Sequence, residues 1–436
     1  MTKTLQIKAP RGTSDVLGEQ AAARAALEAK ARTILEGAGY ERIETPTFEA
    51  TELFARGVGA STDIVQKEMY TFEDASGRSL TLRPEGTAPV CRAYVEHGMH
   101  KLRAPVRLWY LSSFYRHERA QAGRYRQFWQ IGAEALGSED PALDAESIWL
   151  LRTILDQAGA GAGLRLRLSS LGSPGARASY RSQLQAHLRA HEHKLSEDVR
   201  ARIEMNPLRA FDSEHAGTLE TMRTAPLLRD FLDAEDAQHF AEVRARLDAA
   251  GVAYELDPTL VRGLDYYTRT VFEFASEALG AQSGVGGGGR YDGLVEQLGG
   301  PPTPGIGWAA GIERILLAGS TPPAASPPVD LFVAYERPGD SAGERGGQSG
   351  GGAPAVAPTA AFALLSEARA AGLTAQMELA GRSLKGQLGF ANAVGARYVA
   401  ILDGEQAALK DMAGGSQLQI APDEVVHAVL RGLHTL

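Results

Sequence analysis

Two long strand patterns joined by a short polar turn constrain the fold more than any other feature of the chain. Residues 106–115 and 125–136 are rich in aromatic and aliphatic side chains, and the turn 118–123, Glu-Arg-Ala-Gln-Ala-Gly, lies between them. A turn this short joins antiparallel neighbours, because parallel strands need a crossover of about a dozen residues. A second hairpin is predicted at 69–72 and 79–83. We therefore expect an α+β fold with an antiparallel sheet.

Other segments indicate further domains. Residues 19–37 predict a helix, and 173–250 are mostly helical and charged. The proline-rich stretch 321–328 predicts a linker. Beyond it, from 329 to 436, strand and helix patterns alternate, which favours a small α/β domain with a largely parallel sheet. Strands are also expected at 253–260, 270–275 and 305–310, and a mobile loop at 338–358.

The composition excludes several classes of protein. A net charge of -8 over 436 residues disfavours nonspecific coating by nucleic acid, although it is compatible with a local basic face. The single cysteine, Cys91, excludes an internal disulfide and argues against a cysteine-rich zinc site. No apolar run reaches the length of a membrane span, and residues 1–8 lack the apolar core of a signal peptide. We expect a cytoplasmic protein of two or three domains without a membrane partner.

Polar and aromatic side chains share one face of the second long strand, because successive strand side chains point to opposite faces. A face packed only for stability would be more apolar, and a solvated face would not need an aromatic ring. At the end of the preceding strand, Arg116 and Glu118 also share a face, and Arg124 lies beside the turn. The pattern predicts a charged pocket, and a polar outer face with one stray aromatic ring is the alternative. The residues on the face are Arg126, Phe128, Gln130, Gly132 and Glu134.

An arginine and two tyrosines stand together in 260–268, Leu-Val-Arg-Gly-Leu-Asp-Tyr-Tyr-Thr, and four consecutive glycines follow at 286–289. Glycines weaken a strand, but they allow a backbone to come close to a ligand. Arg262 supplies a permanent planar cation suited to phosphate or carboxylate. An ordinary ion pair with Asp265 is the alternative for this arginine.

Two predicted helix starts carry further polar groups. Glu85 and Thr87 flank Gly86 and offer acceptors, for which a simple helix cap is the alternative to a ligand site. At 304–314 a glycine-rich strand runs into a helix whose first turn carries Arg314. Because helix N-termini favour anions, this arginine is a candidate for a terminal phosphate, with a surface salt bridge as the alternative.

These segments resemble motifs of a known family. The hairpin resembles motif 2 of class II aminoacyl-tRNA synthetases, and 260–268 with 283–294 resemble the paired histidine motifs of histidyl-tRNA synthetases. Residues 304–314 resemble motif 3, and 40–49 resemble motif 1, which forms the dimer interface in that class. Ala120 stands where the family usually has proline, and Trp129 where histidine is common. The resemblance covers nearly the whole chain, with the motifs in the family's order.

The resemblance implies roles for single residues. Arg116 and Arg262 would be the catalytic cations at the α-phosphate, Glu85 and Thr87 would bind the α-ammonium group, and Glu134 with a tyrosine hydroxyl would bind the ring nitrogens. The full histidine-binding set would be Glu85, Gly86, Thr87, Arg116, Gln130, Glu134, Arg262, Tyr266 and Tyr267. The ATP-binding set would be Arg116, Glu118, Arg124, Arg126, Phe128 and Arg314. Mg²⁺ would accompany ATP, with neither a protein-bound metal nor a redox cofactor.

The implied activity is ATP-dependent formation of histidyl-adenylate and transfer of histidine to the 3′ end of tRNA(His) by a homodimer. The implied domains are a catalytic domain at 1–172 and 251–320, a helical insertion at 173–250, a linker at 321–328 and an anticodon-binding domain at 329–436. Arg382 and Lys385 would lie near tRNA. For the insertion, contact with the tRNA acceptor arm is our hypothesis.

Three alternatives stay open at this point. The first is a non-catalytic paralogue such as the regulatory subunit of ATP phosphoribosyltransferase, which usually lacks the anticodon domain and several ATP-binding arginines. The second is a kinase-associated pseudo-synthetase module, although the chain contains no kinase domain. The third is a class II enzyme for another amino acid, against which Glu134 and the two tyrosines argue.

Overall fold

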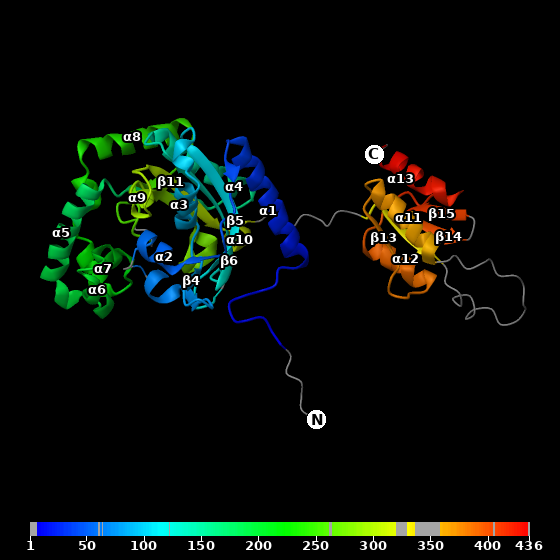
Figure 1. Cartoon of the computed structure of the whole chain (residues 1–436), viewed down its shortest axis with the longest axis horizontal. Helices are drawn as coiled ribbons and strands as arrows, with labels where there is room; N and C mark the ends of the chain where they lie inside the picture. The colour runs from blue at the N-terminus through cyan, green and yellow to red at the C-terminus, as the bar shows by residue number, and fades with distance from the viewer. Residues whose placement is uncertain are drawn as a thin grey trace, which may run out of the picture. The chain divides into compact units, whose positions relative to one another are not determined.

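The computed structural model divides the chain into two compact units, Met1–Ala324 and Ala325–Leu436, and each is described by itself (Figure 1). The structure describes residues 7–59, 62, 64–121, 123–260, 264–319, 329–335, 358–403 and 406–434. The predicted linker 321–328 and nearly all of the predicted loop 338–358 lie outside these residues.

An eight-stranded sheet forms the centre of the first unit, in the order β1-β5-β6-β11-β10-β9-β7-β8. The six central strands pair antiparallel, and only the pairs β1–β5 and β7–β8 are parallel. The antiparallel sheet expected from the sequence is therefore confirmed. The strands are β1 Glu41–Arg42, β5 Val106–Tyr115, β6 Gln127–Leu136, β7 Leu164–Ser170, β8 Glu255–Leu256, β9 Thr268–Ser276, β10 Gly284–Arg290 and β11 Gly305–Gly311.

Several strand predictions need correction. Strand β10 contains the glycine run, which we expected as a ligand-approaching segment and not as a central strand. The strand expected at 253–260 is reduced to the two residues of β8. Strand β7 was not predicted, although its Leu-Arg-Leu-Arg-Leu alternation has the period of a half-buried strand.

Helices cover both faces of this sheet. On one face, α1 (Gly18–Gly37) and α4 (Pro141–Gln157) pack together over a core that includes Trp109, Ile131 and Trp308. The N-terminal residue of α4 is set by Asp140, whose carboxylate accepts the N–H of Ala142 at 2.8 Å. On the other face, α3 (Thr87–Glu96) packs on the short helix α9 (Leu294–Gln297). The polar residues of the candidate site lie on this second side.

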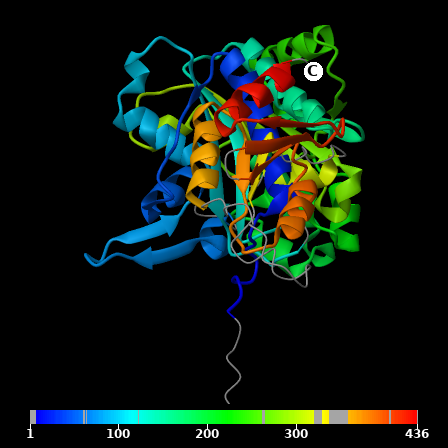
Figure 2. The same ribbon diagram turned by 90° about the vertical axis from the view of Figure 1, so that its right-hand side faces the viewer.

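A small sheet, in the order β2-β4-β3, projects from the body of the first unit (Figure 2). Its strands are β2 Phe48–Ala50, β3 Tyr70–Glu73 and β4 Ser79–Leu82, and α2 (Thr51–Gly57) follows β2 directly. The segment 40–49, expected as a strand interrupted by Pro46, forms two separate strands, β1 and β2, on either side of this proline. Proline cannot donate to a strand ladder, which explains the break.

Between residues 173 and 250, all described, the regular elements are helices, as the charged pattern predicted. They are α5 Pro174–Ala190, α6 Glu197–Arg202, α7 Ala216–Met222 and α8 Ala234–Ala249, with short 3-10 turns between them. Ser173 caps α5 and Asp233 caps α8, each accepting a backbone N–H three residues ahead. The helices α5 to α7 gather at one side of the unit (Figure 1).

The second unit is a five-stranded sheet with helices, in the order β13-β12-β14-β15-β16. Strand β12 pairs parallel with β13 and β14, as expected, while β15 and β16 extend the sheet antiparallel. The sheet is therefore mixed, and β15, β16 and α13 were not predicted. The bounds are β12 Leu331–Tyr335, α11 Pro358–Ala370, β13 Ala375–Met377, α12 Leu384–Ala393, β14 Tyr398–Asp403, β15 Gln406–Asp411, β16 Gln417–Ile420 and α13 Val425–His434.

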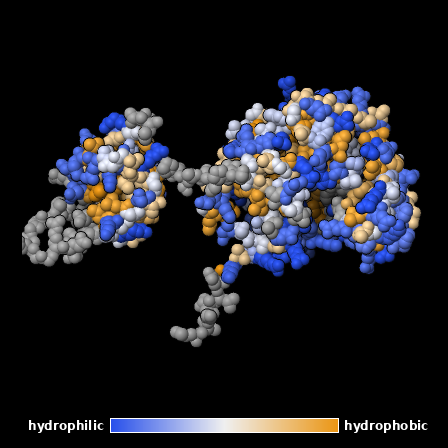
Figure 3. Space-filling view, turned by 180° about the vertical axis from the view of Figure 1, so that it is seen from behind, coloured by the Kyte–Doolittle hydropathy of each residue, from blue (hydrophilic) through white to orange (hydrophobic). Residues whose placement is uncertain are grey.

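Hydrophilic residues cover much of the visible surface, with hydrophobic patches scattered among them (Figure 3). None of the helices in the described part of the chain combines the length and apolar character needed to span a membrane.

Candidate active site

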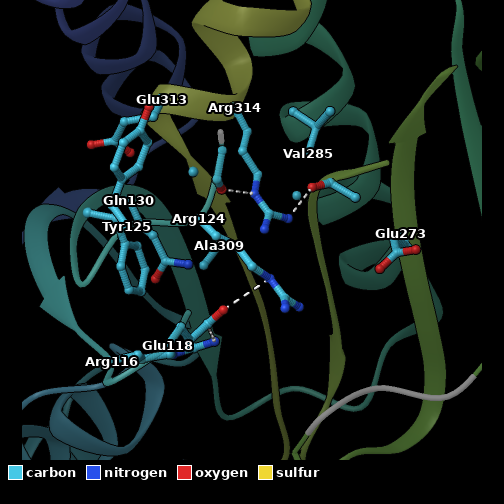
Figure 4. Close-up of a pocket in the computed structure, with 15 residues that line it drawn as sticks. Arg116, Glu118, Arg124, Tyr125, Gln130, Glu273, Val285, Ala309, Glu313 and Arg314 are labelled. Atoms are coloured by element: carbon cyan, nitrogen blue, oxygen red, sulfur yellow. Dashed lines mark hydrogen bonds and ion pairs between the residues drawn. The ribbon is translucent and has the colours of Figure 1, made fainter. Parts of the chain in front are cut away.

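A cavity lined largely by polar groups lies where β6, β11 and β10 run side by side, next to the start of α10 (Ile312–Ala318) (Figure 4). The strand face of β6 and the turn after β5 supply one wall, and the glycine-rich start of β10 supplies the other. Its lining residues are Arg116, Glu118, Gly123, Arg124, Tyr125, Phe128, Gln130, Glu273, Gly284, Val285, Gly286, Ala309, Gly311, Glu313 and Arg314.

Three arginines meet around this first cavity. Arg314 donates from Nε to the carbonyl of Gly123 at 2.8 Å and from Nη1 to the carbonyl of Gly284 at 2.7 Å (Figure 4). Arg124 pairs with Glu118 at 3.0 Å, and Arg116 Nε donates to the carbonyl of Pro84 at 2.9 Å. Burial and the neighbouring Arg124 lower the pKa of Arg314. Cations held close together by carbonyls and one carboxylate suit a ligand with several negative charges.

The alternative for Arg314 was a salt bridge on the helix surface, and its contacts differ from that arrangement. Its hydrogen bonds go to the backbone carbonyls of the turn after β5 and of the start of β10, whereas the carboxylate of Glu313 accepts the backbone N–H of Trp129 at 3.1 Å. Arg314 is thus fixed across the cavity rather than along a helix surface.

The remaining ATP-site candidates lie in two different places. Phe128 lines the first cavity, and the Arg116 guanidinium lies over its ring at 5.4 Å from the centroid. Arg126 precedes β6 and is not among the lining residues. It donates from Nε to the carbonyl of Glu118 at 3.2 Å, and its side chain occupies the space where a Cβ of Gly12 would lie.

A second, smaller cavity adjoins the first, and the two share the lining residues Arg116, Gln130 and Ala309. It therefore continues the first cavity towards α3 and the tyrosines that follow Asp265. The lining residues are Glu85, Gly86, Thr87, Tyr110, Arg116, Gln130, Leu264, Tyr266, Tyr267, Gly287, Trp308 and Ala309.

Glu85 caps α3 and faces the second cavity at the same time. Its carboxylate accepts the N–H groups of Thr87 and Ala88 at 2.9 and 3.0 Å, and Tyr266 Oη donates to it at 3.4 Å. Burial raises the pKa of Glu85, while the two backbone hydrogen bonds oppose that shift. The same carboxylate therefore caps the helix and faces the cavity, so the two interpretations of Glu85 do not exclude each other.

Gln130 contributes an unused acceptor. Its Oε1 is buried and has no hydrogen-bond partner among the described residues. A buried polar atom without a partner costs free energy unless a ligand or water satisfies it. Because Gln130 lines both cavities, its oxygen is well placed for a ligand that bears N–H donors.

Glu134 lies fully buried beside the second cavity, and three hydroxyl groups donate to it. Tyr291 donates to Oε2 at 2.6 Å, Thr87 to Oε1 at 2.8 Å and Tyr110 to Oε1 at 3.4 Å. Burial raises the pKa of Glu134 to about 8, although the hydroxyl donors oppose this shift. Burial therefore favours the protonated form of this carboxyl near neutral pH.

Glycines make room for these side chains. A Cβ on Gly132 would lie 2.2 Å from the Tyr110 ring, and one on Gly86 would lie 2.4 Å from the same ring. A Cβ on Gly307 would lie 1.7 Å from Glu134 Oε2. The ring and the carboxyl occupy volume that only glycine leaves free.

We expect Gly307→Ala to push Glu134 out of its position, because the backbone carbonyl of Ala133 at 2.7 Å blocks any shift of the added methyl group. Overpacking of this kind costs about 1–3 kcal/mol, so the melting temperature should fall. If the cavity binds an imidazole, the ligand's dissociation constant should rise about tenfold or more. Gly37→Ala is the control, since no atom lies within 4 Å of the added Cβ. Equal effects of the two changes on melting and binding would contradict this account.

In the Arg-Tyr-Asp sequence that follows the glycine run, the arginine and the aspartate join a buried ion-pair network, and the tyrosine contacts the candidate site. Arg290 is fully buried and pairs with Asp144 of α4 and with Asp292, while Asp144 also accepts from His239 at 2.9 Å. This buried network fastens the end of β10 to two helices. Tyr291 is the next residue, and its side chain lies on the opposite side of the chain from that of Arg290. There its hydroxyl donates to Glu134.

The remaining predicted site residues are Arg262, Arg382 and Lys385. Arg262 lies outside the described residues, so its catalytic role stays a prediction. In the second unit, Arg382 pairs with the buried carboxylate of Glu378 at 3.1 Å and lies over the ring of Phe390, and Lys385 is exposed.

Sequence reasoning missed Tyr110 and Tyr291, which hold Glu134 from positions 24 and 157 residues away. Tyr110 lies opposite Gly132 in the β5–β6 register, so a tyrosine facing a glycine across the predicted hairpin was the available signal. Tyr291 stands directly after the glycine run, but its partner becomes visible only when β10, β11 and β6 are placed side by side.

An antiparallel sheet flanked by helices, with arginines and a glycine-rich strand around two joined cavities, defines the catalytic domain of a class II aminoacyl-tRNA synthetase. A family model described as histidyl-tRNA synthetase matches residues 12–315. The chain belongs to the histidyl-tRNA synthetase family.

Similar proteins extend over both units. A histidine–tRNA ligase of Desulforudis audaxviator is 47% identical over 435 residues, covering 98% of this chain and 99% of that protein. One of Halorhodospira halophila is 47% identical over 440 residues, covering 98% of each. The crystal structure of apo S. aureus histidyl-tRNA synthetase matches with a TM-score of 0.77 and 34% identity, covering 97% of this chain and 100% of that one.

Proposed function

We propose that this chain is a histidine–tRNA ligase, which uses ATP to activate histidine and transfers it to tRNA(His). The observation that carries the proposal is the junction of the two cavities, where Arg116 and Gln130 line both. A nucleotide in the first cavity and an amino acid in the second would meet at this junction. The relatives named histidine–tRNA ligase match the C-terminal unit as well, which weighs against a regulatory paralogue.

In the first step, a carboxylate oxygen of histidine attacks the α-phosphorus of ATP. The bond from that phosphorus to the bridging oxygen breaks, and pyrophosphate leaves with the electron pair. Both reactants are anionic, so fixed cations at their meeting point lower the barrier. Arg116 stands at this point, and Arg262 is the second cation that we propose for it.

We propose that the second cavity binds histidine. Glu85 and Gln130 offer oxygen acceptors for its α-ammonium group, next to the Thr87 hydroxyl. Glu134 with its protonatable carboxyl and a hydroxyl of Tyr266 or Tyr267 would pair with the two ring nitrogens. Buried polar groups of this kind reject side chains that cannot pair with them more strongly than an apolar wall does.

We propose that the first cavity binds ATP. Phe128 offers a ring face for adenine, Glu118 an acceptor, and Arg124 and Arg314 bind phosphates across from Arg116. Arg126 supports this site indirectly, through its hydrogen bond to the carbonyl of Glu118. Mg²⁺ would arrive with ATP and be held mainly by phosphate oxygens and water, which suits the few carboxylates in this lining.

In the second step, a 3′-terminal ribose hydroxyl of tRNA(His) attacks the carbonyl carbon of the adenylate, and AMP leaves. We propose the second unit, with Arg382 and Lys385, as the anticodon-binding domain, because cations supply affinity for phosphates. A homodimer through the region of 40–49 and a cytoplasmic location belong to the same proposal.

Exchange of pyrophosphate into ATP tests the function directly. We expect exchange to depend on histidine and on none of the other standard amino acids, since only an imidazole pairs with the second cavity. Arg262→Ala is expected to abolish this exchange, and charging of tRNA(His) should follow only in the unaltered chain. Exchange with no amino acid would favour a regulatory paralogue, and exchange with a different one would mean that the second cavity has been misassigned.

A further inference from the structure

Arg177 of the helical segment 173–250 contacts the backbone that carries two of the side chains lining the second cavity. Arg177, in the first turn of α5, donates to the backbone carbonyl of Tyr267 in a short hydrogen bond. Its two terminal nitrogens also approach the carbonyl of Asp265 at 3.4 and 3.5 Å. One guanidinium therefore holds the carbonyls on both sides of Tyr266.

The two tyrosine rings depend on that backbone. Tyr266 and Tyr267 are buried, both line the second cavity, and Tyr266 Oη donates to Glu85 at 3.4 Å. Their rings contact each other at 4.8 Å between centroids, and the Tyr266 ring also meets Tyr291 at 5.8 Å. A shift of the 265–267 backbone therefore moves the wall of the cavity.

A second arginine, Arg269 of β9, connects the central sheet to helix α8 of the helical segment. Arg269 adopts a left-handed conformation with φ of 42°, which is strained for a residue with a side chain and persists only where surroundings impose it. It donates to Asp236 of α8 at 3.1 Å and also pairs with Glu235. Buried Asp236 accepts the N–H of Ser173 at 2.7 Å as well, so the N-terminal ends of α5 and α8 are fastened at this point.

Arg177 is well suited to this task, because in the described part of the chain its guanidinium donates to the carbonyls of Asp265 and Tyr267. Burial lowers the pKa of its guanidinium, and Asp265 is the acidic group that opposes this shift. A desolvated cation interacts more strongly with carbonyl dipoles than an exposed one does. Tyr180, one turn along α5, packs in the same core cluster as the two tyrosines, so the helix itself is fixed relative to them.

We propose that Arg177 is a positioning residue for histidine activation, which from the helical segment fixes the 265–267 backbone and so the tyrosine wall of the cavity. This proposal rests on the assignment of that cavity to histidine. The segment then takes part in the first step of the reaction, in addition to any contact with tRNA.

The test compares Arg177→Ala with Arg181→Ala in pyrophosphate exchange. Arg181 lies one turn further along α5, and its guanidinium also donates to backbone carbonyls, those of Glu204 and Met205, but within the helical segment. For Arg177→Ala we expect the KM for histidine to rise about tenfold and the KM for ATP to change less than about twofold. That tenfold change corresponds to about 1.4 kcal/mol. Arg181→Ala should leave both constants unchanged.

Arg177→Lys serves as the rescue variant, because it keeps the cation but not the planar fork. We expect it to recover part of the loss, with a KM for histidine about threefold above the unaltered chain. If Arg177→Ala does not fold, this variant alone decides, and an unchanged KM overturns the proposal. Calorimetric titration with histidine, without ATP, should give the same order of affinities.

Other outcomes also overturn the proposal. An equal rise of the KM values for histidine and ATP, or an equal effect of Arg181→Ala, would mean that the change only loosens the fold. If the unaltered chain shows no histidine-dependent exchange, the proposed function fails and this proposal with it. If the unaltered chain does exchange but Arg177→Ala matches it, only the positioning role fails.

Discussion

Arg116→Ala is expected to lower the rate constant of adenylate formation about 10³-fold, the largest effect that we predict for a described residue. Loss of one preorganised donor at a developing charge typically costs between about 10² and 10³ in rate. Arg116 lines both cavities, so no other described arginine takes its place at their junction. Single-turnover formation of adenylate, measured at saturating ATP and histidine, checks the prediction.

The control for Arg116 is Arg107→Ala on β5, the strand that Arg116 directly follows. Arg107 pairs with Glu146 at 3.3 Å and lines neither cavity, so adenylate formation should be unchanged. Arg116→Lys should recover only part of the rate, because lysine keeps the charge but not the planar fork that also reaches the carbonyl of Pro84. A folded Arg116→Ala protein that retains more than about a tenth of the rate would refute the role of this cation.

Glu134→Gln is expected to raise the KM for histidine about 10²-fold and to change its pH dependence. Loss of a buried hydrogen bond to a charged group costs about 1.5–3 kcal/mol of binding free energy. In the unaltered chain the carboxyl has a pKa of about 8, and free imidazole has a pKa of about 6.5. If the carboxyl and the imidazole share one proton when bound, binding neither takes up nor releases a proton between these two values.

The sign of the pH effect follows from this proton count. Above about pH 8 the free protein has lost the proton, which binding must recover, so the KM for histidine rises by about tenfold per pH unit. Below about pH 6.5 both partners are protonated and one proton must leave, so the KM rises again. Glutamine cannot hold this proton, so Glu134→Gln should lose the rise near pH 8.

Steady-state exchange assays at several pH values test this account. The α-ammonium group of histidine also titrates at alkaline pH, but it does so equally with both proteins, so the difference between them reports the carboxyl. The KM for ATP should not follow the same curve. Identical pH profiles of the two proteins between pH 7 and 9 would count against a proton shared with Glu134.

Local sequence patterns predicted those helices and strands in which hydrophobic and polar residues repeat regularly. The β5–β6 hairpin was expected at 106–115 and 125–136 and forms at Val106–Tyr115 and Gln127–Leu136, because the alternation and the polar turn are both local. The helix expected at 19–37 is α1. In contrast, the glycines of β10 have little strand propensity, and only pairing with β9 and β11 makes this segment a strand.

The candidate site was predictable as a set of residue types but not as an arrangement. Glu85, Gln130 and Arg116 were found from their motifs, and the structure brings them to one cavity. That Glu134 lies buried beneath three hydroxyl donors, rather than open to the cavity, depends on Tyr110 and Tyr291 from distant strands. Likewise, the charged helical pattern at 173–250 did not indicate that Arg177 contacts the backbone of residues 265–267.

The shared wall of the two cavities has a consequence for the lifetime of the activated amino acid. In the proposed function, histidyl-adenylate is one molecule with two ends, and each end would occupy one of the two cavities that meet at Arg116 and Gln130. A ligand anchored at both ends loses one set of contacts while the other keeps it in place, so it departs far more slowly than either half alone. Under this proposal a reactive anhydride would be retained until a ribose hydroxyl arrives, and its loss into water would be slowed.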